Sequence, residues 1–108
     1  GAIYTLGKGE GVARPKFITG TTTGTVIKTS PGKLERVVFS RDGTGSSTSV
    51  LEIYDDNVAP PSNQVGRIDL TGDGATEIEY DFNFNNGLVV IISNSGGCGT
   101  IGTTITFD

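Results

Sequence analysis

Residues 76–93 read TEIEYDFNFNNGLVVIIS, and this stretch decides the fold class. In its first half, apolar and polar residues alternate without a break. A strand turns successive side chains to opposite faces, so this alternation predicts a strand with one face in the core and one in water. The inward positions are Ile78, Tyr80, Phe82 and Phe84, and the outward positions are Glu77, Glu79, Asp81 and Asn83.

The second half of the stretch is apolar at every position from Leu88 to Ile92, so both faces of this strand need a cover. The pair Asn86-Gly87 is typical of a two-residue type I′ turn, and we therefore expect a hairpin between the two halves. In that register Val89 and Ile91 face the core, while the opposite face carries Leu88, Val90 and Ile92. Monomers rarely expose such a stripe. We expect a neighbouring subunit or an arm to cover it, with a loop of the same chain as the alternative.

The composition predicts one all-β domain. The chain has 108 residues, which is near the commonest domain size. Thr, Val and Ile together number 34, against nine for Ala, Leu and Met, and β-branched residues favour strands over helices. No long window shows a helical apolar period.

Strand signals recur every 8–12 residues from Thr23 onward, which predicts about eight strands in an antiparallel β-sandwich of the jelly-roll type. We expect a bulge near Glu35–Arg36, because Leu34 breaks the alternation of the strand that follows. The segment 56–63, with Pro60 and Pro61, cannot be a paired strand. The expected core positions of the other strands are Val37, Phe39, Leu51, Ile53, Ile101, Thr103, Ile105 and Phe107.

The first 22 residues differ from the rest, because Gly7, Gly9, Gly11 and Pro15 interrupt every short apolar run. We therefore divide the chain into an extended N-terminal arm, residues 1–22, and a sandwich domain, residues 23–108. A cloning remnant followed by an ordinary edge strand is the alternative. The residues expected to hold the arm on a partner are Ile3, Tyr4, Leu6, Arg14, Lys16, Phe17 and Ile18.

The charge is unevenly distributed along the chain. Residues 1–36 carry a net charge of +4 and residues 37–108 a net charge of −8. A mildly basic leading segment on an acidic domain suits docking on an acidic protein surface, although such charges also serve solubility alone. The few clustered cations do not suit nucleic-acid binding. No apolar run is long enough to span a bilayer and no signal peptide is evident, so we expect folding in a reducing cytoplasm.

Nothing in the sequence points to an enzyme. The chain has no His, and its single cysteine, Cys98, lies in a Gly-rich segment without a neighbouring base. One segment, DLTGDGATE at residues 69–77, resembles calcium loops because oxygen-bearing side chains alternate with glycines. A weak calcium site there would use Asp69, Thr71, Asp73 and Glu77; the alternative is an ordinary polar turn, with no cofactor.

Four segments together resemble a recurring pattern of small bacteriophage virion proteins: GTVIKTSPGKLERVVFS (24–40), LEIYDD (51–56), IEYDFNFNNGLVVIIS (78–93) and TTITFD (103–108). The resemblance is to the capsid decoration, or cement, proteins of β-sandwich type, and it covers residues 24–108. The Gly-rich insertion SNSGGCG and the first twenty residues depart from the pattern.

This resemblance implies a homotrimer that binds the major capsid protein on the outside of a phage shell. We expect a structural virion protein made in the bacterial cytoplasm, with no nucleic-acid or membrane partner. A tail or head-completion component is a neighbouring possibility. The rival of another class is a carbohydrate-binding or adhesive sandwich that uses calcium, but the chain has no Trp and only three Tyr to stack on sugar rings.

Overall fold

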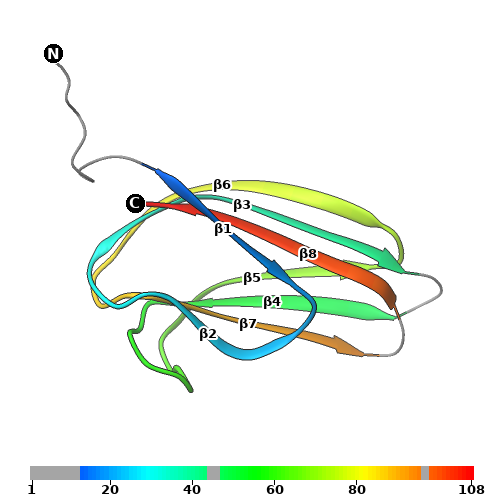
Figure 1. Ribbon diagram of the computed structural model, residues 1–108, viewed down its shortest axis with the longest axis horizontal. Coiled ribbons are helices and arrows are strands. Elements are labelled where there is room, and N and C mark those ends of the chain that lie inside the picture. Colours follow the sequence, from blue (N-terminus) through cyan, green and yellow to red (C-terminus); the bar gives the residue numbers. More distant parts are fainter. Residues whose placement is uncertain (1–12, 44–46, 96–97) are drawn as a thin grey trace, which may run out of the picture.

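The protein is an all-β sandwich of eight strands, seen in a computed structural model that describes residues 13–43, 47–95 and 98–108. Two four-stranded antiparallel sheets pack face to face (Figure 1). The strands are β1 (Arg14–Thr19), β2 (Thr22–Lys28), β3 (Gly32–Gly43), β4 (Thr48–Tyr54), β5 (Gln64–Thr71), β6 (Gly74–Phe84), β7 (Leu88–Ser95) and β8 (Cys98–Phe107).

The strand order is that of a jelly roll. The first sheet has the order β1-β8-β3-β6 and the second β2-β7-β4-β5. Every connection between successive strands therefore crosses between the sheets, except the one from β4 to β5. The predicted fold class and number of strands are confirmed.

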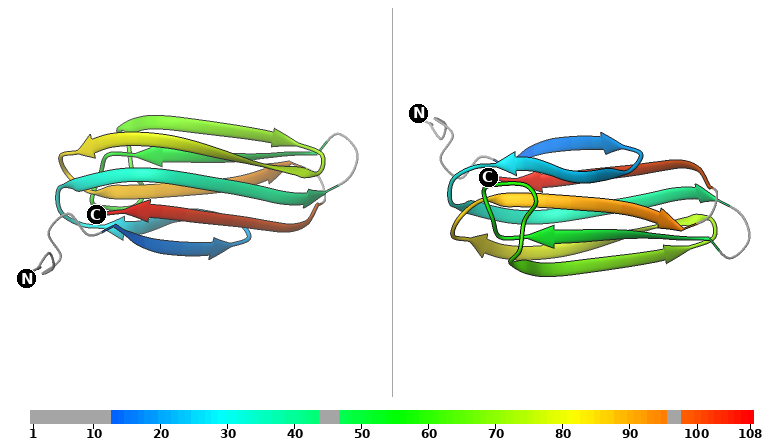
Figure 2. Two further views of the ribbon diagram at one scale, coloured as in Figure 1. Left: turned by 90° about the horizontal axis from the view of Figure 1, so that it is seen from above. Right: turned by 90° about the horizontal axis from the view of Figure 1, so that it is seen from below.

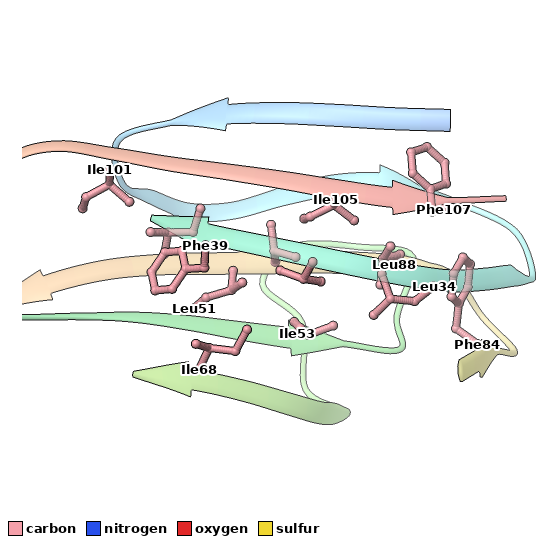
Figure 3. Close-up of a cluster of buried hydrophobic side chains, with 13 residues drawn as sticks. Leu34, Phe39, Leu51, Ile53, Ile68, Phe84, Leu88, Ile101, Ile105 and Phe107 are labelled. Atoms are coloured by element: carbon pink, nitrogen blue, oxygen red, sulfur yellow. The ribbon is translucent and has the colours of Figure 1, made fainter. Parts of the chain in front are cut away.

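The core lies between the two sheets and is built from alternate residues of the inner strands (Figure 3). The inward positions predicted for β3, β4 and β8 are buried, with Val37, Phe39, Leu51 and Ile105 each fully so. In β6 only Phe84 is fully enclosed, while Ile78, Tyr80 and Phe82 are partly buried against the core. Edge strands bury less of a side chain because a neighbour covers them on one side only.

The predicted bulge is present. The register of β3 shifts between Leu34 and Arg36 against both neighbouring strands. This extra residue restores the parity that brings Leu34 and Val37 to the same buried face.

The predicted hairpin at Asn86-Gly87 is wrong. β6 pairs with β3, whereas β7 pairs with β2 and β4 in the other sheet. The turn therefore carries the chain across the sandwich instead of folding it back beside itself. This change reverses the faces expected for β7.

The predicted subunit interface is therefore also wrong. Leu88 and Val90 are 0 % exposed and Ile92 is 1 % exposed, and all three belong to the core cluster. Val90 lies opposite Ile53, and Ile92 opposite Leu51, on the inner face of the sheet. A neighbouring subunit cannot reach these side chains.

The outer face of β7 is covered by the connection between β4 and β5, which was the alternative. Val89 is 0 % exposed although it lies outside the core cluster. A Cβ added to Gly87 would lie 2.5 Å from the Asp56 carbonyl oxygen, and one added to Gly24 of β2 would lie 2.9 Å from Ala59 Cβ. The connection thus runs close over the start of β7 and over β2 (Figure 2, right).

Candidate functional site: two charged rims

The sandwich has two long rims, each formed by one edge strand from each sheet. We call Arg14–Lys28, with β1 and β2, the basic rim, and Gln64–Phe84, with β5 and β6, the acidic rim. They lie on opposite sides of the molecule (Figure 2). The chain forms them in this way because β1 continues into β2, and β5 into β6, through connections of only two residues.

Strand β1 lies inside the predicted arm, so the sandwich begins before residue 23. Arg14–Thr19 pairs with β8 along its whole length, from Arg14 opposite Phe107 to Thr19 opposite Gly102. Ile18 packs against the core, so it is not a free anchor. The other predicted anchors, Ile3, Tyr4 and Leu6, lie outside the described residues.

Phe17 is the most exposed large apolar residue among those described, at 62 %. It lies on the outer face of β1, where its ring is 3.4 Å from the position that a Cβ on Gly102 of β8 would occupy. The absence of a side chain at Gly102 lets the ring rest on the sheet. Phe17 is therefore a surface side chain with one face supported and the other open.

Among the described strands none lies beside the outer edge of β1, and this edge is only partly able to accept one. The Gly20 amide donates to the Ile101 carbonyl, which places the even-numbered residues of β1 in hydrogen-bonded pairs with β8. The amide positions of Pro15, Phe17 and Thr19 then point outward. Because proline has no N–H, Pro15 removes one outward donor without costing a bond inside the sheet.

Residues 13–31 hold three cations and no acid. Arg14 and Lys16 are exposed, and neither takes part in any salt bridge found among the described residues. Lys28 donates to the backbone carbonyl of Asp108 over 2.9 Å. The predicted cations of the arm are thus held on a regular strand at the rim.

Residues 64–84 hold one cation and five acids. Three of the acids have partners across the sheet surface: Asp69 with Arg67 at 2.8 Å, Glu77 with Arg36 at 3.2 Å, and Asp81 with Lys33 at 2.6 Å. Asp73 and Glu79 are exposed and take part in none of the described ion pairs. The acidic rim therefore keeps an excess of negative charge.

The residues proposed for calcium do not converge. Asp69 is held by Arg67 on β5, and Glu77 by Arg36 on the other sheet. The Thr71 hydroxyl lies 2.9 Å from that of Thr48. Within the described ranges no group of three or more His, Cys, Asp or Glu side chains could hold a metal ion. Between β5 and β6 the chain turns at Gly72 and Asp73.

The sequence reading missed the role of Asp55. Its carboxylate is 5 % exposed and accepts backbone N–H bonds from Asn85, Asn86 and Gly87 at 2.8–3.4 Å. Burial raises the pKa of Asp55, but the bonds from these three amides outweigh it and hold the pKa below its usual value. Asp55 thus fixes the turn that switches the chain between sheets, and only its position after an alternating strand hinted at this.

Arg41 is a second buried charge that the sequence did not reveal. Its guanidinium is 3 % exposed and donates to Ser49 Oγ at 2.9 Å, Ser47 Oγ at 2.7 Å and the Gly72 carbonyl. Since these acceptors come from β4 and from the turns before β4 and after β5, Arg41 ties the two sheets together at one end. Its role is structural.

A shallow depression lies where β2 begins beside β7. The surface that it exposes is mostly apolar, and its lining consists of Thr21, Thr22, Thr23, Ile91, Ile92, Ser93 and Asn94. No helix in the described ranges is long and apolar enough to cross a membrane.

No protein-family model matches the chain, and no curated protein matches it. Among solved structures, the chain is similar to the Yersinia pseudotuberculosis-derived mitogen, with 17 % identity over 89 % of this chain and 86 % of that one. The TM-score of this match is 0.39, and the likeness carries no argument about function.

Proposed function

We propose that this protein is a structural virion protein that binds the outside of a phage shell as a trimer. The observation that carries the proposal is the placement of β1. The leading segment enters the sandwich through an edge strand on the rim, and this strand presents the exposed ring of Phe17 on its outer face. Chain that precedes such a strand can reach a partner without disturbing the core.

The mechanism is passive attachment. The resemblance to decoration proteins supports a shell as the partner, and the leading residues Ile3, Tyr4 and Leu6 supply apolar anchors. Three copies that bind together turn weak single contacts into stable attachment, because the second and third arms bind at a high effective concentration.

The test is co-sedimentation of the purified protein with undecorated shells of the phage that encodes it. We expect saturable binding in multiples of three copies, and a loss of at least tenfold in affinity when Ile3, Tyr4 and Leu6 are all replaced by Ser. A matched control replaces Thr21, Thr22 and Thr23 by Ser, which leaves the anchors intact. Absence of binding to these shells would contradict the proposal.

A carbohydrate-binding module is the second candidate, and the mostly apolar depression between Thr21–Thr23 and Ser93 is the surface that would hold a sugar. A concave, mostly apolar surface with a few hydroxyl groups at its margin can bind and orient a small ligand. A glycan array separates the two functions. Binding that is lost in a Ser93→Trp variant, which fills the depression, would favour this candidate over shell attachment.

A further inference from the structure

The two rims are complementary in charge. Residues 13–31 carry cations only, while residues 64–84 carry five acids against one cation. Each rim also keeps two exposed charges outside the described ion pairs, namely Arg14 and Lys16 on one side and Asp73 and Glu79 on the other. Charges without partners on opposite rims of one molecule can be satisfied by a second copy of it.

We propose that the basic rim of one copy binds the acidic rim of the next, head to tail. The contact is heterologous, because it joins different surfaces of the two copies. Such contacts form a closed ring when the rotation between neighbours allows closure, and a filament when it does not.

Strand directions fit this arrangement. Neighbouring strands in each sheet are antiparallel, so β1 runs opposite to β6 at the two edges of the first sheet, and β2 opposite to β5 in the second. A second copy in the same orientation, placed alongside, therefore brings β1 antiparallel to β6 and β2 antiparallel to β5. A rotation between neighbours about an axis parallel to the strands keeps these directions, so a closed ring retains them just as a filament does.

The backbone edges alone do not make this contact strong. Pro15 lacks an N–H on the β1 edge, and β6 departs from regular pairing at Asp81, whose φ is +49°. Devices of this kind restrain open-ended pairing of edges. Charge then selects the partner, which makes the contact specific and dependent on salt.

The inference rests on the proposed function only for the number of copies: a ring of three would be the trimer that binds the shell. It also replaces the disproved interface at Leu88, Val90 and Ile92. In this arrangement Arg14 and Lys16, first assigned to the capsid, serve the contact between subunits.

The first experiment measures oligomeric state by analytical ultracentrifugation without any shell present. We expect the full chain to associate at about 0.02 M salt and to weaken by at least tenfold at about 0.5 M salt. The basic-rim variant Arg14→Glu/Lys16→Glu and the acidic-rim variant Asp73→Lys/Glu79→Lys should each be monomeric while retaining the far-UV circular dichroism of the parent. The control Lys33→Glu/Arg36→Glu alters net charge as much as the basic-rim variant but leaves Arg14 and Lys16 in place. Because it also removes the partners of Asp81 and Glu77 and so makes the acidic rim more negative, it should associate at least as strongly as the parent.

The second experiment mixes the two rim variants in equal amounts. In one variant the charges outside ion pairs are then acidic on both rims, and in the other variant they are basic on both rims, so each variant binds the other. We expect complexes with even numbers of chains, because a ring of three cannot alternate. Rescue by mixing also excludes misfolding as the cause of the monomers.

Either of two results with the variants would overturn the inference: rim variants that associate as the parent does, or a mixture of the two rim variants that stays monomeric. A parent that is monomeric at low salt would overturn it as well. None of these results bears on shell binding by a single chain, which co-sedimentation measures separately, so a failure of the inference can be told from a failure of the proposed function.

Discussion

At the residue scale, the fold depends on two buried charges that each make several hydrogen bonds. Asp55 accepts three backbone amides at the β6–β7 turn, and Arg41 joins both sheets at the other end of the sandwich. Hydrogen bonds to a charged group are stronger than neutral ones, and loss of the charged partner leaves the others unsatisfied. These two side chains therefore contribute to stability out of proportion to their size.

Replacing Asp55 by Ala should lower the free energy of unfolding by about 2–4 kcal/mol at neutral pH. The pKa of Asp55 is lower in the folded chain than in the unfolded one, so its contribution is complete above the unfolded value. It should diminish as the pH falls below the ordinary carboxyl pKa of about 3.9. Urea unfolding of parent and variant across this range checks the prediction. The control is Asp56→Ala, which removes a carboxylate that accepts an exposed hydrogen bond from the Ser62 amide. An equally large loss of stability in this variant would contradict the role assigned to Asp55.

Val90 supplies a direct test of where β7 faces. The side chain is 0 % exposed, so Val90→Asp places a carboxylate in the core, at a cost of at least several kcal/mol. Since small domains are stable by only about 5–15 kcal/mol, we expect the variant to be largely unfolded by circular dichroism. Val58→Asp is the matched control, because Val58 is 57 % exposed in the loop before β5. A folded Val90→Asp protein would contradict the placement of β7.

At the scale of elements, the crossing from β6 to β7 decides the topology. Gly87 and Gly74 have nearly the same backbone angle, with φ of +159° and +158°. A Cβ on Gly87 would meet the Asp56 and Lys28 carbonyl oxygens at 2.5 and 2.6 Å, whereas one on Gly74 has nothing within 4 Å. A side chain added at either position therefore meets similar backbone strain, but it is crowded by other atoms only at Gly87.

Gly87→Ala should therefore destabilise the protein more than Gly74→Ala does. Backbone strain costs each variant about 1–3 kcal/mol, and crowding adds to the loss only at Gly87. Thermal unfolding of both variants measures the difference. Equal losses would show that the loop between β4 and β5 does not press on this turn.

Strand β1 belongs to the sandwich, whereas the sequence predicted that residues 1–22 form a separate arm. A chain that starts at residue 23 lacks all six residues of β1 and exposes the edge of β8, while a chain that starts at residue 13 keeps them. We expect the shorter chain to unfold at a lower urea concentration, because it loses the packing of Ile18 and the pairing with β8. Equal midpoints would mean that residues 1–22 act as one separate arm.

At the scale of the whole molecule, one core serves both sheets. The core cluster draws residues from each of them, including Phe39 and Ile105 on one side and Leu51 and Val90 on the other. Neither sheet can keep its inner face buried without the other. The same sandwich places opposite charges on its two long rims, away from this core.

We therefore expect the monomeric basic-rim variant Arg14→Glu/Lys16→Glu to unfold in one cooperative transition. Calorimetric and van't Hoff enthalpies should agree, as they do for most single domains of this size. Two resolved transitions in scanning calorimetry would mean that the sheets unfold independently. The variant is chosen because dissociation of the proposed oligomer would otherwise contribute to the transition.

Strands β6 and β7 show how much of the fold could be predicted from the sequence. The alternation in β6 predicted its inner and outer faces, because only one register buries its apolar residues. The bulge in β3 followed from the same parity argument. In β7 every residue from Leu88 to Ile92 is apolar, so both registers bury an apolar face and local pattern could not choose between them.

The sequence by itself determined the all-β class, the number of strands and most of the core, because side-chain alternation is a local property of each strand. Only the tertiary structure decided which strands are neighbours, that Asn86-Gly87 crosses between sheets, and that the loop before β5 covers β7. It also decided that the acids of residues 69–77 separate and that the charges gather on two opposite rims. These features depend on contacts between residues far apart in the chain, and no local pattern records them.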